Sequence, residues 1–97
     1  MMSMFLKDPG SSLDHAVDWA SDYLAGRTIL ASEWRLEPDQ TGRAQPLTLT
    51  AAQLVGGRTF VRIGGGAAGH IYRVVNHVSL SDGNSDERTL VVRVEDR

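Results

Sequence analysis

The sequence contains no cysteine among its 97 residues. Disulfide bonds and thiolate metal sites are therefore excluded, and the chain carries no sign of the redox compartment in which it works. Its apolar runs are only a few residues long, far short of the roughly 20 residues that a membrane-spanning helix needs. The first residues also lack a basic segment followed by an apolar run, so we expect neither a signal peptide nor a membrane partner.

The charged residues show no strong bias of sign. Ten lysines and arginines accompany twelve aspartates and glutamates, which gives a formal net charge of −2. The basic residues are scattered, whereas a protein that binds nucleic acid usually carries a basic stripe, so no nucleic-acid partner is expected. A chain of this length forms one domain with a single modest core.

Long amphipathic helices are also missing. Apolar and polar residues instead alternate along short segments separated by turn signals, and this two-residue period is typical of β-strands. The pattern predicts an all-β sandwich, although the first segment also fits a helix. The expected strands are Leu13–Trp19, Thr28–Glu37, Pro46–Thr50, Arg58–Ile63, Tyr72–Leu80 and Arg88–Glu95.

Two further features of this pattern make specific predictions. In the second expected strand, Leu30, Trp34 and Leu36 share one face and should point into the core. Residues 21–26 should form a helical turn that closes on glycine. The pattern is ambiguous at residues 51–57, where we expect a crossing loop.

Aromatic residues make up only 6% of the chain. Trp19, Trp34 and Tyr72 are expected in the core rather than in a ligand site, because each can bury on the order of 200 Å². Tyr72 follows Gly69 by three residues, near the start of a long penultimate strand. A tyrosine corner occupies this place in immunoglobulin-like sandwiches, where its hydroxyl bonds to nearby backbone.

Glycine is concentrated in the stretch RIGGGAAGHI at residues 62–71. Gly64, Gly66 and Gly69 match G-x-G-x-x-G, the spacing of a dinucleotide-binding turn. That turn must lead into a helix whose N-terminus receives the pyrophosphate, but the residues that follow are β-branched and alternate in polarity. We therefore expect these glycines, together with Gly65, to form a turn between two strands without a nucleotide cofactor.

The remaining polar clusters lack the pattern of a chemical site. Asp82 and Gly83 begin the segment DGNSD, which resembles the start of a calcium loop, but the glycine and glutamate that an EF-hand requires further along are absent. A hairpin turn is expected there instead. The three histidines lack the spacing of a zinc site, and no serine has the context of a nucleophile. We expect no metal, no cofactor and no catalytic residue.

Several fragments of the chain, in their order, resemble a known family. They are FLKDP at 5–9, LDHAVDW at 13–19, YL at 23–24, the glycine run at 64–69 and YRV at 72–74. Together they resemble the phage fibre–tail adaptor-like proteins, which are small structural proteins of tailed phages and prophages. The resemblance implies an immunoglobulin-like antiparallel β-sandwich of about seven strands at residues 13–97, preceded by a short N-terminal arm at residues 1–12.

The same resemblance implies a non-enzymatic virion protein, acting as a tail or fibre adaptor through protein–protein contacts. Its partners would be other tail, fibre or head–tail proteins of the phage, and it would form a homo-oligomer in the particle after synthesis in the cytoplasm of the bacterial host. A capsid-decoration or head–tail completion role suits the same fold. A small carbohydrate- or metal-dependent binding domain is the alternative from another class.

Within the arm, the candidate partner-binding residues are Phe5, Leu6, Lys7, Asp8 and Pro9. Two apolar side chains followed by a stiff proline could dock in a neighbour's groove or add to the edge of a neighbour's sheet. A disordered terminus is the equal alternative.

Overall fold

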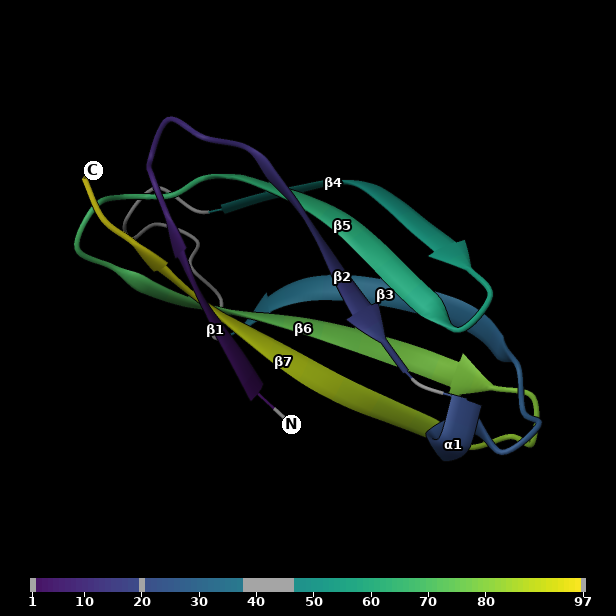
Figure 1. Ribbon diagram of the computed structural model, residues 1–97. Coiled ribbons are helices and arrows are strands. Elements are labelled where there is room, and N and C mark those ends of the chain that lie inside the picture. The colour runs from purple at the N-terminus through teal and green to yellow at the C-terminus, as the bar shows by residue number, and fades with distance from the viewer. Residues whose placement is uncertain (1, 20, 38–46, 97) are drawn as a thin grey trace.

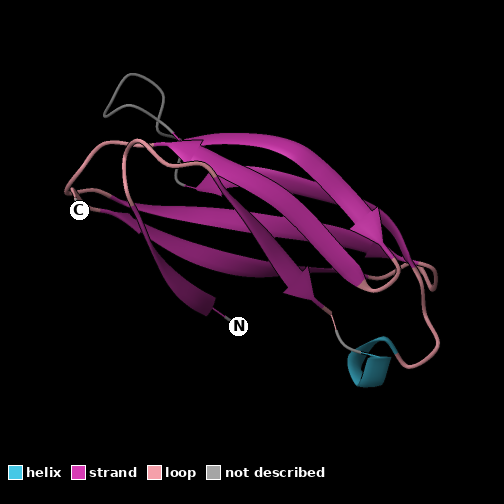
Figure 2. Ribbon diagram, turned by 45° about the horizontal axis from the view of Figure 1, so that its top comes forward, coloured by secondary structure: helices cyan, strands magenta, loops and turns pink. Residues whose placement is uncertain are grey.

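The computed structural model describes residues 2–19, 21–37 and 47–96. In this part of the chain seven strands form two facing layers, with one helical turn at an end of the molecule (Figures 1 and 2), so the predicted all-β sandwich is confirmed. No helix in the described ranges is long and apolar enough to cross a membrane. The elements are β1 (Met2–Lys7), β2 (Leu13–Asp18), α1 (Ser21–Leu24), β3 (Ile29–Glu37), β4 (Leu47–Val55), β5 (Arg58–Gly65), β6 (Ile71–Leu80) and β7 (Ser85–Val94).

The two sheets have the strand orders β1-β7-β6-β3 and β2-β5-β4. Neighbouring strands are antiparallel except β1 and β7, which run parallel. If the strands are lettered A to G along the chain, sheet A-G-F-C faces sheet B-E-D. The constant-type immunoglobulin domain differs in that its strand A joins B, E and D. The expected immunoglobulin-like fold is therefore confirmed, with one parallel pair that the sequence did not predict.

The core lies between the two sheets and takes alternate residues from each strand. Thr59, Val61 and Ile63 of β5 are almost completely buried, as the alternation predicted. Tyr72 and the inward residues of β6 face them from the other sheet. Burying one large apolar side chain contributes about 1.5–3 kcal/mol, so this layer supplies most of the driving force for folding.

The prediction that Leu30 points into the core is wrong. A bulge between Ile29 and Ala31 shifts the register of β3 against β6, and Leu30 is 66% exposed. A bulge inserts an extra residue and so breaks the two-residue period on which the expectation depended. Beyond the bulge, Trp34 and Leu36 pack against the core as expected.

The prediction of a crossing loop at residues 51–57 is also wrong. β4 continues to Val55, and the chain turns through Gly56 and Gly57 into β5. The register of β4 shifts between Thr50 and Gln53. This shift interrupts the alternation of apolar and polar residues, so the sequence pattern did not reveal the second half of the strand. Pro46, expected at the start of this strand, lies outside the described residues.

Residues 2–7 of the expected N-terminal arm lie in the sandwich as β1. The strand runs along β7, with Met2 opposite Thr89 and Lys7 opposite Val94. The segment pairs because its alternation suits an edge strand, with Phe5 directed inward against the core. The chain then turns at residues 8–12 and crosses to β2 in the other sheet (Figure 1).

Candidate functional site

The outer face of the four-stranded sheet carries an apolar surface at β1. Because Phe5 points inward, Met4 and Leu6 point outward, and they are 65% and 49% exposed. Leu6 lies opposite Arg93 of β7, which in turn lies opposite Ile71 of β6, 56% exposed. We call Met4, Leu6 and Ile71 the β1 surface. Met4 and Leu6 lie on β1 and Ile71 lies on β6, with β7 between these two strands.

The opposite half of the same outer face is ionic. Arg35 of β3 contacts Glu87 at 2.9 Å and Glu37 at 3.0 Å, and the Nδ1 atom of His77 lies 3.0 Å from Glu87. The hydrogen bonds from Arg35 and then His77 hold the pKa of Glu87 below its ordinary value. Exposed pairs of this kind contribute little to stability, so the ionic half mainly keeps this part of the sheet hydrated.

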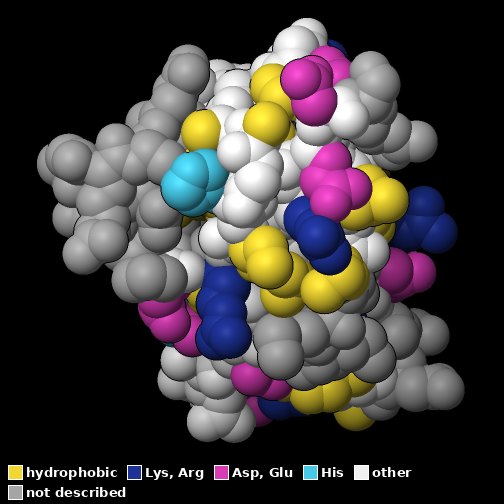
Figure 3. All heavy atoms as spheres, turned by 90° about the vertical axis from the view of Figure 1, so that its left-hand side faces the viewer, with side chains coloured by type: hydrophobic (Ala, Val, Ile, Leu, Met, Phe, Trp, Pro, Cys, Tyr) yellow, Lys and Arg dark blue, Asp and Glu magenta, His cyan; other side chains and the backbone are white. Residues whose placement is uncertain are grey.

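Seen from the end that carries the C-terminus, hydrophobic side chains gather at the centre, with basic and acidic side chains beside them (Figure 3). The basic residue in the row between Leu6 and Ile71 is Arg93, which forms an ion pair with Glu95 at 2.9 Å. Arginine is enriched in protein–protein contacts, so a surface in which Arg93 lies between aliphatic side chains suits such a contact.

Lys7 has a structural role that its sequence context did not predict. Its side chain is 1% exposed, and Nζ donates hydrogen bonds to the carbonyl oxygens of Gly65 at 2.6 Å and Asp8 at 2.8 Å. Desolvation lowers the pKa of Lys7, and the charge of Asp8 partly opposes this shift. The ammonium group thus fastens the end of β1 to the end of β5.

The other candidate residues of the N-terminal segment differ in exposure. Leu6 is exposed, whereas Phe5, Asp8 and Pro9 are partly buried. The Asp8 carboxylate accepts a hydrogen bond from the Gly10 N–H at 2.8 Å and so closes the turn after β1. Of the five residues, Leu6 therefore offers the most side-chain surface to a partner.

The glycine run forms the turn from β5 to β6 at the same end of the sandwich. Gly65, Gly66 and Gly69 have positive φ angles of 70°, 94° and 84°, while Gly64 is the penultimate residue of β5. β6 begins directly afterwards, so this segment has no helix N-terminus for a pyrophosphate. A β-carbon at Gly66 would lie 2.8 Å from Leu47, which explains glycine there.

Tyr72 fastens this turn to the core. Its side chain is 1% exposed, and its hydroxyl oxygen accepts a hydrogen bond from the Ala67 N–H at 2.9 Å. This side chain–backbone bond is the interaction that characterises a tyrosine corner. The structure therefore brings Tyr72, the glycine run and Lys7 together at one end of the molecule.

Trp19 belongs to a buried polar network that joins the two sheets. Its Nε1 donates to Asn76 Oδ1 at 3.1 Å, and the Thr59 hydroxyl donates to the same oxygen at 2.7 Å. The Asn76 amide in turn donates to Ser32 Oγ at 2.9 Å. Trp34, opposite Asn76 on β3, is partly buried against the core.

Asp82 and Gly83 form the turn between β6 and β7, at the far end of the sandwich. The Asp82 carboxylate accepts from the Asn84 N–H at 3.0 Å, and Gly83 has a φ of 90°. The hydrogen bond from Asn84, assisted by Arg27, lowers the pKa of Asp82. The described residues contain no group of three or more histidines, cysteines, aspartates or glutamates placed to hold a metal ion.

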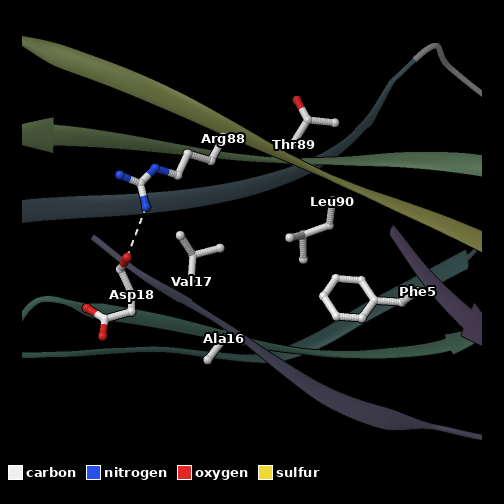
Figure 4. Close-up of a pocket in the computed structure, with 7 residues that line it drawn as sticks. All are labelled: Phe5, Ala16, Val17, Asp18, Arg88, Thr89 and Leu90. Atoms are coloured by element: carbon white, nitrogen blue, oxygen red, sulfur yellow. Dashed lines mark hydrogen bonds between the residues drawn. The ribbon is translucent and has the colours of Figure 1, made fainter. Parts of the chain in front are cut away.

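A small pocket opens where β1, β2 and β7 meet (Figure 4). Arg88 reaches across it from β7, and its Nη1 donates to the Asp18 carbonyl at 2.9 Å. The volume of about 120 Å³ is below the roughly 300 Å³ at which pockets for drug-sized ligands begin. The residues that line it are Phe5, Ala16, Val17, Asp18, Arg88, Thr89 and Leu90.

Comparison with known proteins identifies the family. A protein-family model described as Podophage GP4 fiber-tail adaptor protein gp77 matches residues 7–93, from the last residue of β1 into β7. No curated protein matches the chain. The match covers most of the chain and confirms the resemblance drawn from the ordered fragments. The chain therefore belongs to the Podophage GP4 fiber-tail adaptor protein gp77 family, which is a family of phage tail structural proteins.

Proposed function

We propose that this protein acts in the virion as a fibre–tail adaptor, and that the β1 surface contacts a neighbouring tail or fibre protein. The family match supports the adaptor role. The observation that carries the contact is the exposure of Met4, Leu6 and Ile71 together on one sheet face. The protein is made in the host cytoplasm and is incorporated when the tail assembles.

The β1 surface suits binding because it is ordered before a partner arrives. Every residue of β1 is in register with β7, and the buried Lys7 ammonium holds the end of the strand. A partner therefore does not bear the entropy of ordering a free arm, which would otherwise weaken the complex. Covering one exposed leucine contributes up to about 1.5–3 kcal/mol.

This proposal changes how the N-terminal candidates would act. Leu6 provides the contact, Phe5 and Lys7 keep the strand in place, and Asp8 and Pro9 shape the turn that follows. The partner then binds on top of a paired strand. Binding of a free arm in a groove of the partner would be less favourable in free energy, since the arm would first have to separate from β7.

Leu6→Asp tests the proposal, because it places a charge in the contact without touching the core. We expect incorporation into virions to fall by about tenfold or more, since burying a carboxylate costs several kcal/mol and Arg93, opposite position 6, is already paired with Glu95. The melting temperature of the purified protein should stay near that of the wild type. Incorporation is measured by quantifying the protein in purified particles.

Val55→Asp is the matched control. Val55 is 61% exposed and lies on β4 in the other sheet, so a charge there leaves the β1 surface intact. The Val55 variant should be incorporated like the wild type. Normal incorporation of Leu6→Asp, or equal losses for the two variants, would contradict a contact through the β1 surface.

A further inference from the structure

Three of the four edge strands carry features that discourage pairing with another sheet. The edges are β1 and β3 in one sheet and β2 and β4 in the other. β3 and β4 each contain a bulge, and β3 also bears alternating charges at Glu33, Arg35 and Glu37. On β2, Asp14 and Asp18 point outward and pair with arginines of β5. Bulges and exposed charges are the usual protections of a sheet edge.

β1 has none of these protections. Its residues from Met2 to Leu6 are uncharged, the strand contains no proline, and its register with β7 is continuous. Its one charged residue, Lys7, is turned inward and bonded to the Gly65 carbonyl. An uncharged edge strand without a bulge or a proline is a template for another strand.

The backbone of β1 also presents hydrogen-bonding groups on the side away from β7. The Lys7 carbonyl accepts from the Glu95 N–H at 2.9 Å, so the backbone groups of Lys7 point toward β7. Backbone groups alternate in direction along a strand, and the N–H and C=O groups of Met4 and Leu6 therefore point away from β7. β1 ends its sheet, so no described strand pairs with these groups.

We propose that β1 pairs antiparallel with β1 of a second copy of this chain. A two-fold axis brings the same strand opposite itself, and residues 2–6 tolerate this because no like charges meet. Met4 and Leu6 of the two copies lie on the same face of the joined sheet and pack across the new strand pair. Two four-stranded sheets thereby become one sheet of eight strands.

The self-complementary edge favours a second copy over a strand from a different protein. β1 is uncharged and carries outward aliphatic side chains at alternate positions, so two copies of it are complementary to each other in an antiparallel pair. A strand from a different protein would have to supply a matching sequence of its own. The pairing is independent of the adaptor proposal. Both β1 surfaces would lie on one side of the dimer, so a tail or fibre protein could still bind there.

Sedimentation equilibrium of the purified full chain tests the inference. At concentrations from about 1 µM to 1 mM, the range of weak to moderate affinities, the 10.6 kDa chain should approach twice that mass. Leu6→Pro removes an N–H that faces the open edge, because proline lacks this donor, and it also removes the leucine side chain from the contact. Met4→Lys places like charges near each other across the two-fold axis. Each change should raise the dimer dissociation constant by about tenfold or more.

Ile71→Lys is the matched control, because Ile71 is equally exposed but lies on β6, two strands from the edge. It should dimerise like the wild type, and circular dichroism melts should show that all three variants fold. A wild-type chain that stays monomeric at every concentration overturns the inference, as do folded Leu6→Pro and Met4→Lys variants that dimerise normally. Either result leaves the adaptor proposal standing, because that proposal is tested in virions.

Discussion

At the scale of single residues, buried polar side chains hold the parts of this sandwich together. Asn76 is completely buried and accepts hydrogen bonds from Trp19 and Thr59 across the gap between the sheets. Lys7 is buried at the end of β1 and donates to the Gly65 carbonyl. Polar groups removed from water are costly unless they are paired, so each of these contacts also fixes one arrangement of the strands.

Asn76→Leu should destabilise the protein although leucine has a similar volume. The substitution removes the acceptor of the Thr59 hydroxyl and the nearer of two acceptors of the Trp19 Nε1–H, and a buried donor without a partner costs about 1–3 kcal/mol. We expect the free energy of unfolding in urea to fall by about 2 kcal/mol or more. Asn84→Ala, in the exposed hairpin turn, should change it by less than about 0.5 kcal/mol, and equal losses would contradict a role for the network.

Gly66→Ala should cost more stability than Gly69→Ala. Both residues have positive φ angles, of 94° and 84°, which disfavour alanine by about 1–2 kcal/mol. Only at Gly66 would the new β-carbon also meet neighbours, Leu47 at 2.8 Å and Val94 at 2.9 Å, whereas nothing lies within 4 Å at Gly69. The steric part should add about 1–3 kcal/mol in thermal unfolding. Equal melting temperatures for the two variants would show that the turn has room to relax.

His15 should make stability depend on pH. Burial lowers its pKa in the folded protein, and the charge of Asp14 only partly opposes this, so the unfolded chain binds the proton more readily. The contribution of neutral His15 is complete above the unfolded pKa of about 6.5 and is lost progressively as the pH falls from there through the lower pKa of the folded protein. Between about pH 8 and pH 5 the melting temperature of the wild type should therefore fall more than that of His15→Gln. Parallel curves for the two proteins would contradict this account.

The sequence predicted some of these residue-level roles and could not predict others. Trp19 and Tyr72 are large and apolar, so a buried position was the default expectation. Lys7 was expected to contact a partner, and its burial could not be foreseen because lysine is almost never fully buried without a partner. Its partner, Gly65, is 58 residues away in the chain, and no local pattern links the two.

At the scale of elements, regular alternation revealed the strands, and irregularities hid them. β5, β6 and β7 alternate cleanly and were found with nearly correct limits, whereas the bulges in β3 and β4 displaced Leu30 and concealed residues 51–55. The pairing of β1 with β7 joins the two ends of the chain. Such a non-local pairing leaves no local signal, and residues 2–7 therefore resembled a free arm.

Ala51→Gly tests the bulge in β4. Ala51 has a φ of 53°, a left-handed conformation that is unfavourable for residues with a β-carbon but ordinary for glycine. The substitution should raise the free energy of unfolding by about 0.5–1 kcal/mol. Ala52→Gly, at the next position and without a positive φ, should lower it. Destabilisation by both changes would contradict a strained conformation at Ala51.

At the scale of the whole molecule, the fold divides its surfaces between different tasks. The interior is filled by packed rings and aliphatics, and the pocket where β1, β2 and β7 meet has a volume of only about 120 Å³. The outer face of the four-stranded sheet is ionic at β3 and apolar at β1. Because many unrelated functions share this fold, the surface rather than the topology specifies the role. The family match covers residues 7–93, so Met4 and Leu6 lie outside the matched residues.

Electron microscopy of the assembled phage particle tests the central claim most directly, since it locates the protein and shows what covers each face. The account predicts density for the sandwich at the junction of tail and fibre, with Met4, Leu6 and Ile71 covered by a neighbouring protein. Density on the capsid shell, or a tail position in which these three side chains face solvent, would contradict it.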